Sequence, residues 1–414
     1  MLLTGEAGIG KSRISQTLRE RLAGETHAVV LLQCSPYHGS SALYPLVQYF
    51  ERAAGIAPTD TPEQRGQKLE ALLGEDVVLA PQAFGYLLRL LGLPDGGRRA
   101  ALGDDPMQDK AQLVQAPLEL LRSLSRQLPV LLLIEDAHWI DPTTEQLGAL
   151  TVEQSRDMRL LLLVTARPEY KPPWGSPANL TRLALNRLGQ RQCAELVAAV
   201  TGGRALPAEV LAEIVLKTDG IPLFVEELTK TVVQSGLLEE TPTGYRLRGP
   251  LPALAIPSTL QDSLMARLDR LAPAKEVAQV GAMIGREFSH RLLAAVLRSP
   301  PATLDAALGD LVRSELVARR GVASDAVYTF RHALIRDTAY NSMLKGQRVL
   351  RHAQIAAAIE QLAPDTMASQ PELLAYHCQE GGQAEAALSY WSVAGDLAVG
   401  RCRRSPSHRP CRIR

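Results

Sequence analysis

The sequence predicts an α/β fold built on a parallel sheet in residues 1–172, followed by regions that are mainly helical. Fully apolar segments of strand length occur at Ala28–Leu32, Val130–Ile134 and Leu160–Val164. Strands of this composition are buried on both faces, as in a parallel sheet covered by helices. Segments with helical periodicity separate these strands. After Pro172 and Pro173 the strand signal fades and helical patterns dominate.

The segment Gly5-Glu6-Ala7-Gly8-Ile9-Gly10-Lys11-Ser12 matches G-x-x-x-x-G-K-[ST], the pattern of a phosphate-binding loop. It lies between a short apolar strand, at Leu2 and Leu3, and a predicted helix, Arg13–Leu22. Glycines let successive backbone N–H groups surround a polyphosphate, and the helix adds its positive dipole end. Lys11 is placed to reach the β- and γ-phosphates, and the Ser12 hydroxyl to bind Mg²⁺. We therefore predict a nucleotide site.

Polar residues follow two of the predicted strands. Glu135 and Asp136 come after Ile134, and Arg167 comes shortly after Val164. In parallel sheets ligands bind at the carboxyl ends of strands, where the phosphate loop also lies. One acid is expected to hold Mg²⁺ and the other to orient the attacking water, and the sequence leaves the assignment open. Arg167 is expected to sense the γ-phosphate, the alternative being a surface ion pair.

Periodicity and turn residues predict the remaining elements in order. Asp141, followed by Pro142, has the composition of a helix N-cap. Leu316–Arg320 and Val327–Phe330 predict a β-hairpin. A polar connector is expected at Thr241–Pro257. Helices are predicted at Leu43–Ala54, Pro62–Leu73, Asp109–Arg126, Thr143–Gln154, Leu188–Val200, Pro207–Thr218, Leu223–Ser235, Ser258–Leu271, Lys275–Ile284 and Thr303–Ser314.

These elements suggest five regions. Residues 1–172 form the phosphate-binding core, and residues 173–250 an all-α lid. Three helices and a hairpin predict a winged-helix-like domain in residues 251–346. Residues 347–400 contain Glu372–Gln379 and Ala384–Val399, which resemble the helix pair of a tetratricopeptide (TPR) type solenoid repeat. Residues 401–414 are expected to be a basic, disordered tail.

Composition restricts the possible partners. The net charge is +1, and the last fourteen residues carry six arginines and no acid, so the first 400 residues carry −5. This balance gives no general case for nucleic-acid binding. Five scattered cysteines form no metal-ligand pattern and suggest reduced thiols. The longest apolar runs are far below the roughly 20 residues of a membrane helix. We expect a cytoplasmic protein without membrane contact.

Together the motifs resemble the STAND class of P-loop ATPases, signal-transduction ATPases with numerous domains, in their origin-recognition-like AAA branch. In particular they resemble the ATPase region that follows a class III adenylate/guanylate cyclase domain in large bacterial regulators. The resemblance extends to about Leu350, and its matching stretches begin at Thr4, Leu131, Leu161, Gly220, Ile256 and Phe330.

The resemblance implies ATP or ADP and Mg²⁺ as ligands. It places phosphate and Mg²⁺ contacts on the loop from Gly5 to Ser12 and on the adjacent Arg13. It assigns Glu135 and Asp136 to the metal and to hydrolysis, and Arg167 to the first sensor. It further implies that Pro222 packs near the base. His332 is the candidate for a winged-helix histidine that touches the bound diphosphate.

Two departures from the family pattern stand out. Relatives carry an upstream segment that completes the first strand, and a cyclase domain before it. Neither precedes Met1, so we expect an internal start and a chain shortened at both ends.

The predicted function is an ATP-binding switch with slow hydrolysis. It would receive a signal from protein partners through the repeats and control an upstream effector, a cyclase in relatives. The alternative is a transcription activator of the LuxR or maltose-regulator type. Against it, Ser258–Asn341 offers too few basic residues for a recognition helix, namely Arg313, Arg319 and Arg320. A small-molecule kinase is set aside, because such enzymes are shorter.

Overall fold

The computed structural model describes residues 1–35, 39, 41–57, 60–74, 77, 79–93, 106–175, 179–242, 244–249, 259–321, 326–362 and 370–403. The expected boundary at residue 251 and most of the expected tail, from residue 404, lie outside the described residues.

The core contains a five-stranded sheet in the order β2-β3-β4-β1-β5. Its pairs are all parallel, and the strands are β2 (Ala28–Gln33), β3 (Val130–Glu135), β4 (Leu160–Ala166), β1 (Leu2–Thr4) and β5 (Arg182–Ala184). The predicted parallel α/β fold is confirmed. Strand β5 extends the sheet beyond the expected boundary at residue 172. Its three residues are exposed, so no apolar pattern marked it in the sequence.

Alternate residues of the strands enter two separate cores. Leu131 and Leu133 face α1 (Lys11–Leu22), where Leu18 packs against them. Their neighbours in β3 face a larger cluster. That cluster is formed with α2 (Tyr44–Ala53), α3 (Pro62–Leu73), α4 (Pro81–Leu90), α5 (Pro106–Gln127) and α6 (Pro142–Gln154). Burial on both faces explains why β3 reads as an uninterrupted apolar segment. Helix α4 was not predicted.

The region expected to be an all-α lid contains a β-hairpin, which corrects that expectation. Helices α7 (Gln190–Val200), α8 (Ala208–Thr218) and α9 (Pro222–Gln234) enclose an apolar core. Strands β6 (Leu238–Thr241) and β7 (Gly244–Leu247) then pair in antiparallel fashion. A cross-strand ion pair of 2.8 Å joins Glu239 to Arg246. The charged outer face of the hairpin made it look like a polar connector in the sequence.

The next region contains the predicted hairpin, β9 (Val317–Arg320) and β10 (Val327–Phe330), and a third strand, β8 (Glu287–Ser289), on the other side of β10. Five helices pack with this sheet in one cluster: α10 (Leu260–Arg270), α11 (Ala272–Ile284), α12 (His290–Leu297), α13 (Pro301–Arg313) and α14 (Ala333–Asn341). We call residues 259–341 the winged-helix region.

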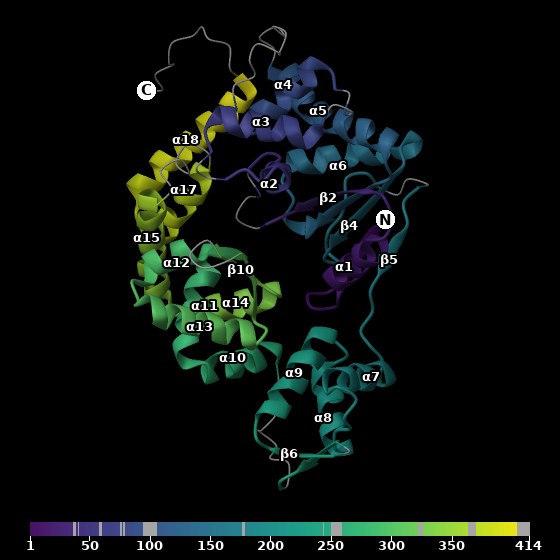
Figure 1. Cartoon of the computed structure of the whole chain (residues 1–414), viewed down its shortest axis with the longest axis vertical. Helices are drawn as coiled ribbons and strands as arrows, with labels where there is room; N and C mark the ends of the chain where they lie inside the picture. Colours follow the sequence, from purple (N-terminus) through teal and green to yellow (C-terminus); the bar gives the residue numbers. More distant parts are fainter. Residues whose placement is uncertain are drawn as a thin grey trace.

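The carboxyl-terminal helices bring the chain back to the core (Figure 1). They are α15 (Lys345–Leu362), α17 (Pro371–Glu380) and α18 (Ala384–Arg403). Helix α18 packs on α5, and the Ser41 hydroxyl donates to Glu372 of α17 at 3.1 Å. The core, the lid, the winged-helix region and these helices are therefore arranged as a ring. In the described part of the chain no helix is long and apolar enough to cross a membrane.

Candidate nucleotide-binding site

The phosphate loop follows β1 and ends at the amino terminus of α1. Gly8 and Gly10 adopt left-handed conformations, with φ of 79° and 103°. A Cβ on Gly10 would meet nothing within 4 Å, so there is open space beside the residue that precedes α1. The loop is closed tightly at its base, where a Cβ on Gly5 would lie 2.7 Å from the Ile9 side chain. This is the backbone cradle that the motif predicts.

Lys11 is folded back onto the loop. Its Nζ donates to the carbonyl oxygens of Gly5 at 2.7 Å and of Glu6 at 2.9 Å. The side chain is buried, and burial lowers the pKa of its ammonium group, an effect that Asp136 opposes. The two carbonyls therefore occupy two of the three ammonium donors that a bound phosphate could accept from.

The two acids after β3 have different surroundings. Glu135 accepts hydrogen bonds from the Ser15 hydroxyl at 2.6 Å and from the Gln33 amide at 3.4 Å. Asp136 has a left-handed backbone (φ 56°), and its N–H donates to Thr165 Oγ1 at 3.1 Å. Burial raises the pKa of the Asp136 carboxyl, whereas nearby cations, Arg286 first among them, lower it. Glu135 is thus held between α1 and β2, and Asp136 faces the cations of the site.

Arg167 follows β4 and lies beside the aromatic residues after β3. Its guanidinium carbon is 5.4 Å from the centroid of a Trp139 ring, within the range of a cation–π contact. The His138 ring lies 4.2 Å from Trp139, and both of its nitrogens are buried without a hydrogen-bond partner. Burial, together with Arg167 and Lys11, lowers the pKa of His138 to about 4, so the imidazole is neutral at pH 7.

The lid touches the phosphate loop directly. The Leu223 N–H, at the start of α9, donates to the Gly8 carbonyl at 3.2 Å, and a Cβ on Gly8 would lie 3.1 Å from Leu223 Cβ. Pro222 is the first residue of α9, so it stands next to this contact. Arg187 donates to both oxygens of Glu6 at 2.9 Å and also pairs with Asp219.

His332 and Arg13 lie at the periphery. His332 is the N-cap residue of α14, and burial lowers the pKa of its imidazole, with Glu226 of α9 opposing. Within the described ranges no hydrogen bond or ion pair joins His332 to the phosphate loop. Arg13 is exposed on α1 and lies 4.0 Å from Glu20. Their expected nucleotide contacts remain predictions.

The residues present fit a magnesium nucleotide. The cradle is open at Gly10, and the Ser12 side chain is exposed beside it. Among the described residues no group of three His, Cys, Asp or Glu side chains forms a metal cage. Mg²⁺ does not require one, because it binds through one or two carboxylates together with substrate phosphates and water. Ser12 and Asp136 supply oxygens of this kind.

The structure brings most of the predicted residues together. Asp136 and Arg167 both influence the ionisation of Lys11, so the three lie around one point. The predicted N-cap is confirmed, because Asp141 accepts from the N–H groups of Thr143 and Thr144 at 3.0 and 2.9 Å.

Three further residues of the site were not predicted from the sequence: Ser15, Thr165 and Arg286. Ser15 lies one helical turn after Ser12, and Thr165 is a polar residue in an apolar strand, so each left a local signal. Arg286 comes from the winged-helix region, and no local signal in the sequence marked it as part of the site.

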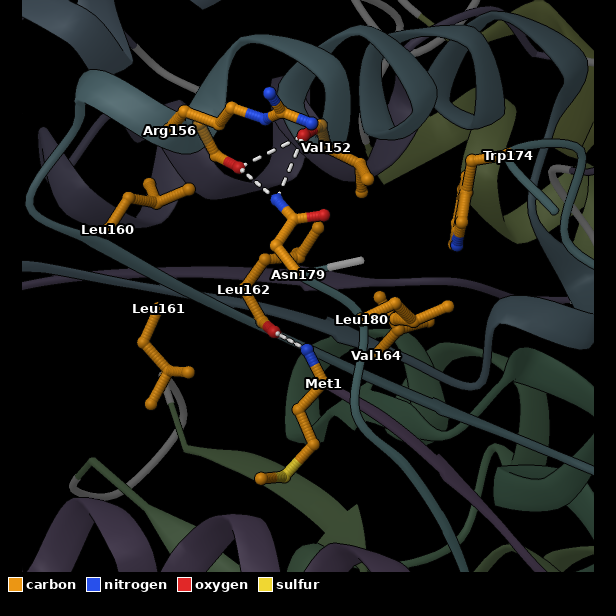
Figure 2. Close-up of a pocket in the computed structure, with 11 residues that line it drawn as sticks. Met1, Val152, Arg156, Leu160, Leu161, Leu162, Val164, Trp174, Asn179 and Leu180 are labelled. Atoms are coloured by element: carbon orange, nitrogen blue, oxygen red, sulfur yellow. Dashed lines mark hydrogen bonds between the residues drawn. The ribbon is translucent and has the colours of Figure 1, made fainter. Parts of the chain in front are cut away.

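A cavity of about 380 Å³ lies at the opposite end of the sheet, near the amino ends of β1 and β4 (Figure 2). The Met1 ammonium donates to the Leu162 carbonyl at 2.6 Å, and the Asn179 amide to the Val152 carbonyl at 3.4 Å. Leu161 is 43% exposed there. β1 pairs with the last three residues of β4, from Val164 onward, and before them, among the described residues, only the Leu162 carbonyl has a partner on that side, the Met1 ammonium. The cavity is remote from the phosphate loop.

Comparison with known proteins agrees with this geometry. A family model described as an AAA ATPase domain matches residues 1–164. An uncharacterized protein of Rhizobium meliloti is 30% identical over 407 residues, which are 97% of this chain and 38% of that protein. The chain thus spans well under half the length of this relative.

Two solved structures also match most of this chain. A STAND protein with a tetratricopeptide repeat sensor from Pyrococcus horikoshii matches 97% of this chain and 55% of its own, with a TM-score of 0.50 and 11% identity. Cdc6p from Pyrobaculum aerophilum matches 87% of each chain, with a TM-score of 0.36 and 13% identity. Residues 1–164 thus match the model of an AAA ATPase domain, a class that binds nucleotide with Mg²⁺. Over most of its length the chain is similar in fold to the STAND protein.

Proposed function

We propose that this chain, with its AAA ATPase domain in residues 1–164, is a nucleotide-operated regulatory switch that binds ATP or ADP with Mg²⁺ and hydrolyses ATP slowly. One observation carries the proposal: the lid rests on the phosphate loop through the hydrogen bond from Leu223 to Gly8. A nucleotide that enters the loop must adjust to this contact, so its phosphates and the lid influence each other's position.

The residues would divide the work as follows. The loop from Gly5 to Ser12 would hold the phosphates, with Lys11 exchanging its carbonyl partners for phosphate oxygens. Arg167 and Arg13 would add positive charge, while Pro222 and His332 would contact the nucleotide from the lid and the winged-helix region. Mg²⁺·ATP supplies the phosphoanhydride that is cleaved.

Of the two acids, Asp136 is proposed to face the metal and the attacking water. The two oxygens of Glu135 already accept hydrogen bonds, one from Ser15 and one from Gln33. These bonds favour a role for Glu135 in holding the site together. A carboxylate held on both oxygens would lose these bonds on turning to a metal, and each is worth about 1–3 kcal/mol in a buried setting.

The ring arrangement supports regulation as the outcome. The helices α17 and α18, proposed to begin a TPR-like array for protein partners, contact the core that binds the nucleotide. A switch of this kind needs about 5.5 kcal/mol of differential affinity to move from mostly closed to mostly open. The effector, attached or separate, is proposed to be a cyclase or another signalling enzyme, as in the proteins that the chain resembles.

Equilibrium binding of fluorescent ATP and ADP analogues, with and without Mg²⁺, tests the proposal. Wild-type protein should bind both, and Lys11→Ala should weaken binding about 10- to 100-fold, as expected for lost charge-assisted hydrogen bonds. Arg19→Ala, an exposed change on the same helix, is the matched control. Binding that is equal in wild type and Lys11→Ala, or absent in both, would overturn the proposal.

A further inference from the structure

The winged-helix region delivers one arginine to the nucleotide site. Arg286 lies between α11 and β8, and its carbonyl accepts the Phe330 N–H of β10 at 3.0 Å. The connection is packed closely, because a Cβ on Gly281 would lie 2.8 Å from the ring of Phe288. Arg286 is therefore mounted on a rigid part of this region, so movement of its backbone requires movement of the region.

The Arg286 side chain pairs with an acid of the core. Its Nη1 lies 3.9 Å from Asp136 Oδ2, and the two side chains are 31% and 20% exposed. This separation is too long for a hydrogen bond, so the contact is ionic only. Its Nε is buried and has no hydrogen-bond partner. The guanidinium thus holds Asp136 loosely and retains a donor that is not used.

The other cations near Asp136 have their own contacts. Lys11 donates to loop carbonyls, and Arg167 lies over Trp139. Arg336 donates to Asp337 at 3.0 Å. In the described part of the chain, Arg286 is the cation that forms an ion pair with Asp136. The pair also joins the winged-helix region to the core across 150 residues of sequence, from Asp136 to Arg286.

We propose that Arg286 is a positioning residue that holds the Asp136 carboxylate while no metal is bound and releases it when Mg²⁺ arrives with the nucleotide. The inference rests on the proposed function. Mg²⁺ takes carboxylate oxygens at about 2.0–2.1 Å in strict octahedral geometry. A divalent cation on Asp136 also repels the guanidinium that approaches the same group. The contact between the winged-helix region and the core would therefore weaken as the metal binds.

The test titrates Mg²⁺ into the full chain saturated with ADP and follows the radius of gyration by small-angle X-ray scattering. ADP binding in EDTA is verified first, so that failure of the proposed function is recognised separately. In wild type the radius of gyration should rise with Mg²⁺. In EDTA, the radius of gyration of Arg286→Gln should be shifted only part of the way towards the wild-type value in Mg²⁺, because one partly exposed ion pair contributes little to the closed state. The variant should bind Mg²⁺ about two- to fivefold more tightly, as the loss of such a pair predicts.

Two variants keep the result interpretable. Arg286→Lys preserves the charge and should restore the response to Mg²⁺. Arg291→Gln, an exposed change in the same region, removes an equal charge and should behave as wild type. If ADP binds but the radius of gyration of wild type is insensitive to Mg²⁺, the proposal is overturned even if Arg286→Gln fails to fold. It is equally overturned if Arg286→Gln folds and responds as wild type does.

Discussion

The hydroxyl of Ser15 donates to Glu135 at 2.6 Å and so ties the helix after the phosphate loop to the end of β3. Ser15 is 1% exposed, whereas Ser12, one turn earlier, is open to solvent. Two serines of one helix thus serve different purposes: Ser15 stabilises the empty site, and Ser12 is available to a ligand.

Ser15→Ala should lower the free energy of unfolding by about 1–3 kcal/mol, because it removes the shorter of the two hydrogen bonds to the partly buried Glu135 carboxylate and leaves only the 3.4 Å bond from Gln33. Ser12→Ala should change it by less than about 0.5 kcal/mol, as exposed substitutions do, and should instead weaken Mg²⁺-dependent nucleotide binding. Urea denaturation and nucleotide titration separate the two effects. Equal stability losses in the two variants would contradict this division.

Gly220→Ala should destabilise the lid strongly. Gly220 has φ of 70°, and an added Cβ would lie 2.2 Å from the Leu188 carbonyl oxygen. A left-handed non-glycine residue costs about 1–2 kcal/mol before any clash. Gly236→Ala is the matched control, because Gly236 has φ of 78° and open space around it. Denaturant unfolding should show a larger loss for Gly220→Ala, and a loss no larger than that of the control would refute the steric argument.

Arg267→Met should cost up to about 3–5 kcal/mol of unfolding free energy, since the buried carboxylate of Glu227 would keep only the more distant Lys230, 3.9 Å away, as an ionic partner. Arg267 of α10 and Glu227 of α9 form an ion pair with side chains only 3% and 4% exposed, at the junction of the lid and the winged-helix region. The double variant Arg267→Met/Glu227→Gln should recover part of this loss. A double-mutant cycle measures the coupling, and strictly additive losses would contradict it.

The chain should lose stability in mild acid because of two buried histidines. His352 and His377 are each 1% exposed, and their Nδ1 atoms are 2.9 Å apart. Burial, together with the charge of Arg348, lowers the pKa of His352 from 6.5 to about 4. Burial, together with His352, lowers the pKa of His377 from 6.5 to about 3. Below pH 6.5 the unfolded chain binds protons that the folded chain does not, so stability falls as the pH drops from 6.5 towards 4.

The contribution of the two protons of this pair to the slope should reach at most about 2.7 kcal/mol per pH unit. Urea unfolding at a series of pH values measures it. His352→Asn/His377→Asn should flatten the profile between pH 6.5 and 4, and His27→Asn, a change outside the pair, should not. A profile as steep in the double variant as in wild type would show that other groups are responsible.

Sequence alone determined the parallel core and the phosphate loop. Apolar segments such as Val130–Ile134 are unambiguous because both faces of a parallel strand are buried. The loop was recognisable because its chemistry requires glycines, Lys11 and Ser12 at set spacings. Positions directly after a strand, such as Asp136 and Arg167, could be assigned to the same edge of the sheet, because the carboxyl ends of parallel strands lie together there. These features depend on residues that are close together in the sequence or that recur at the regular spacing of a parallel sheet.

Only the tertiary structure decided what surrounds that loop. The exposed strand β5 has no apolar alternation, because backbone pairing with β1 holds it in place. In the hairpin β6–β7 the alternation is too short to be recognised, since only Tyr245 and Leu247 of β7 pack on the lid core. The contact of Leu223 with Gly8 and the pair of Arg286 with Asp136 join distant segments. Such contacts follow from how whole regions pack, and packing depends on the complementary shape and charge of surfaces that no local pattern records.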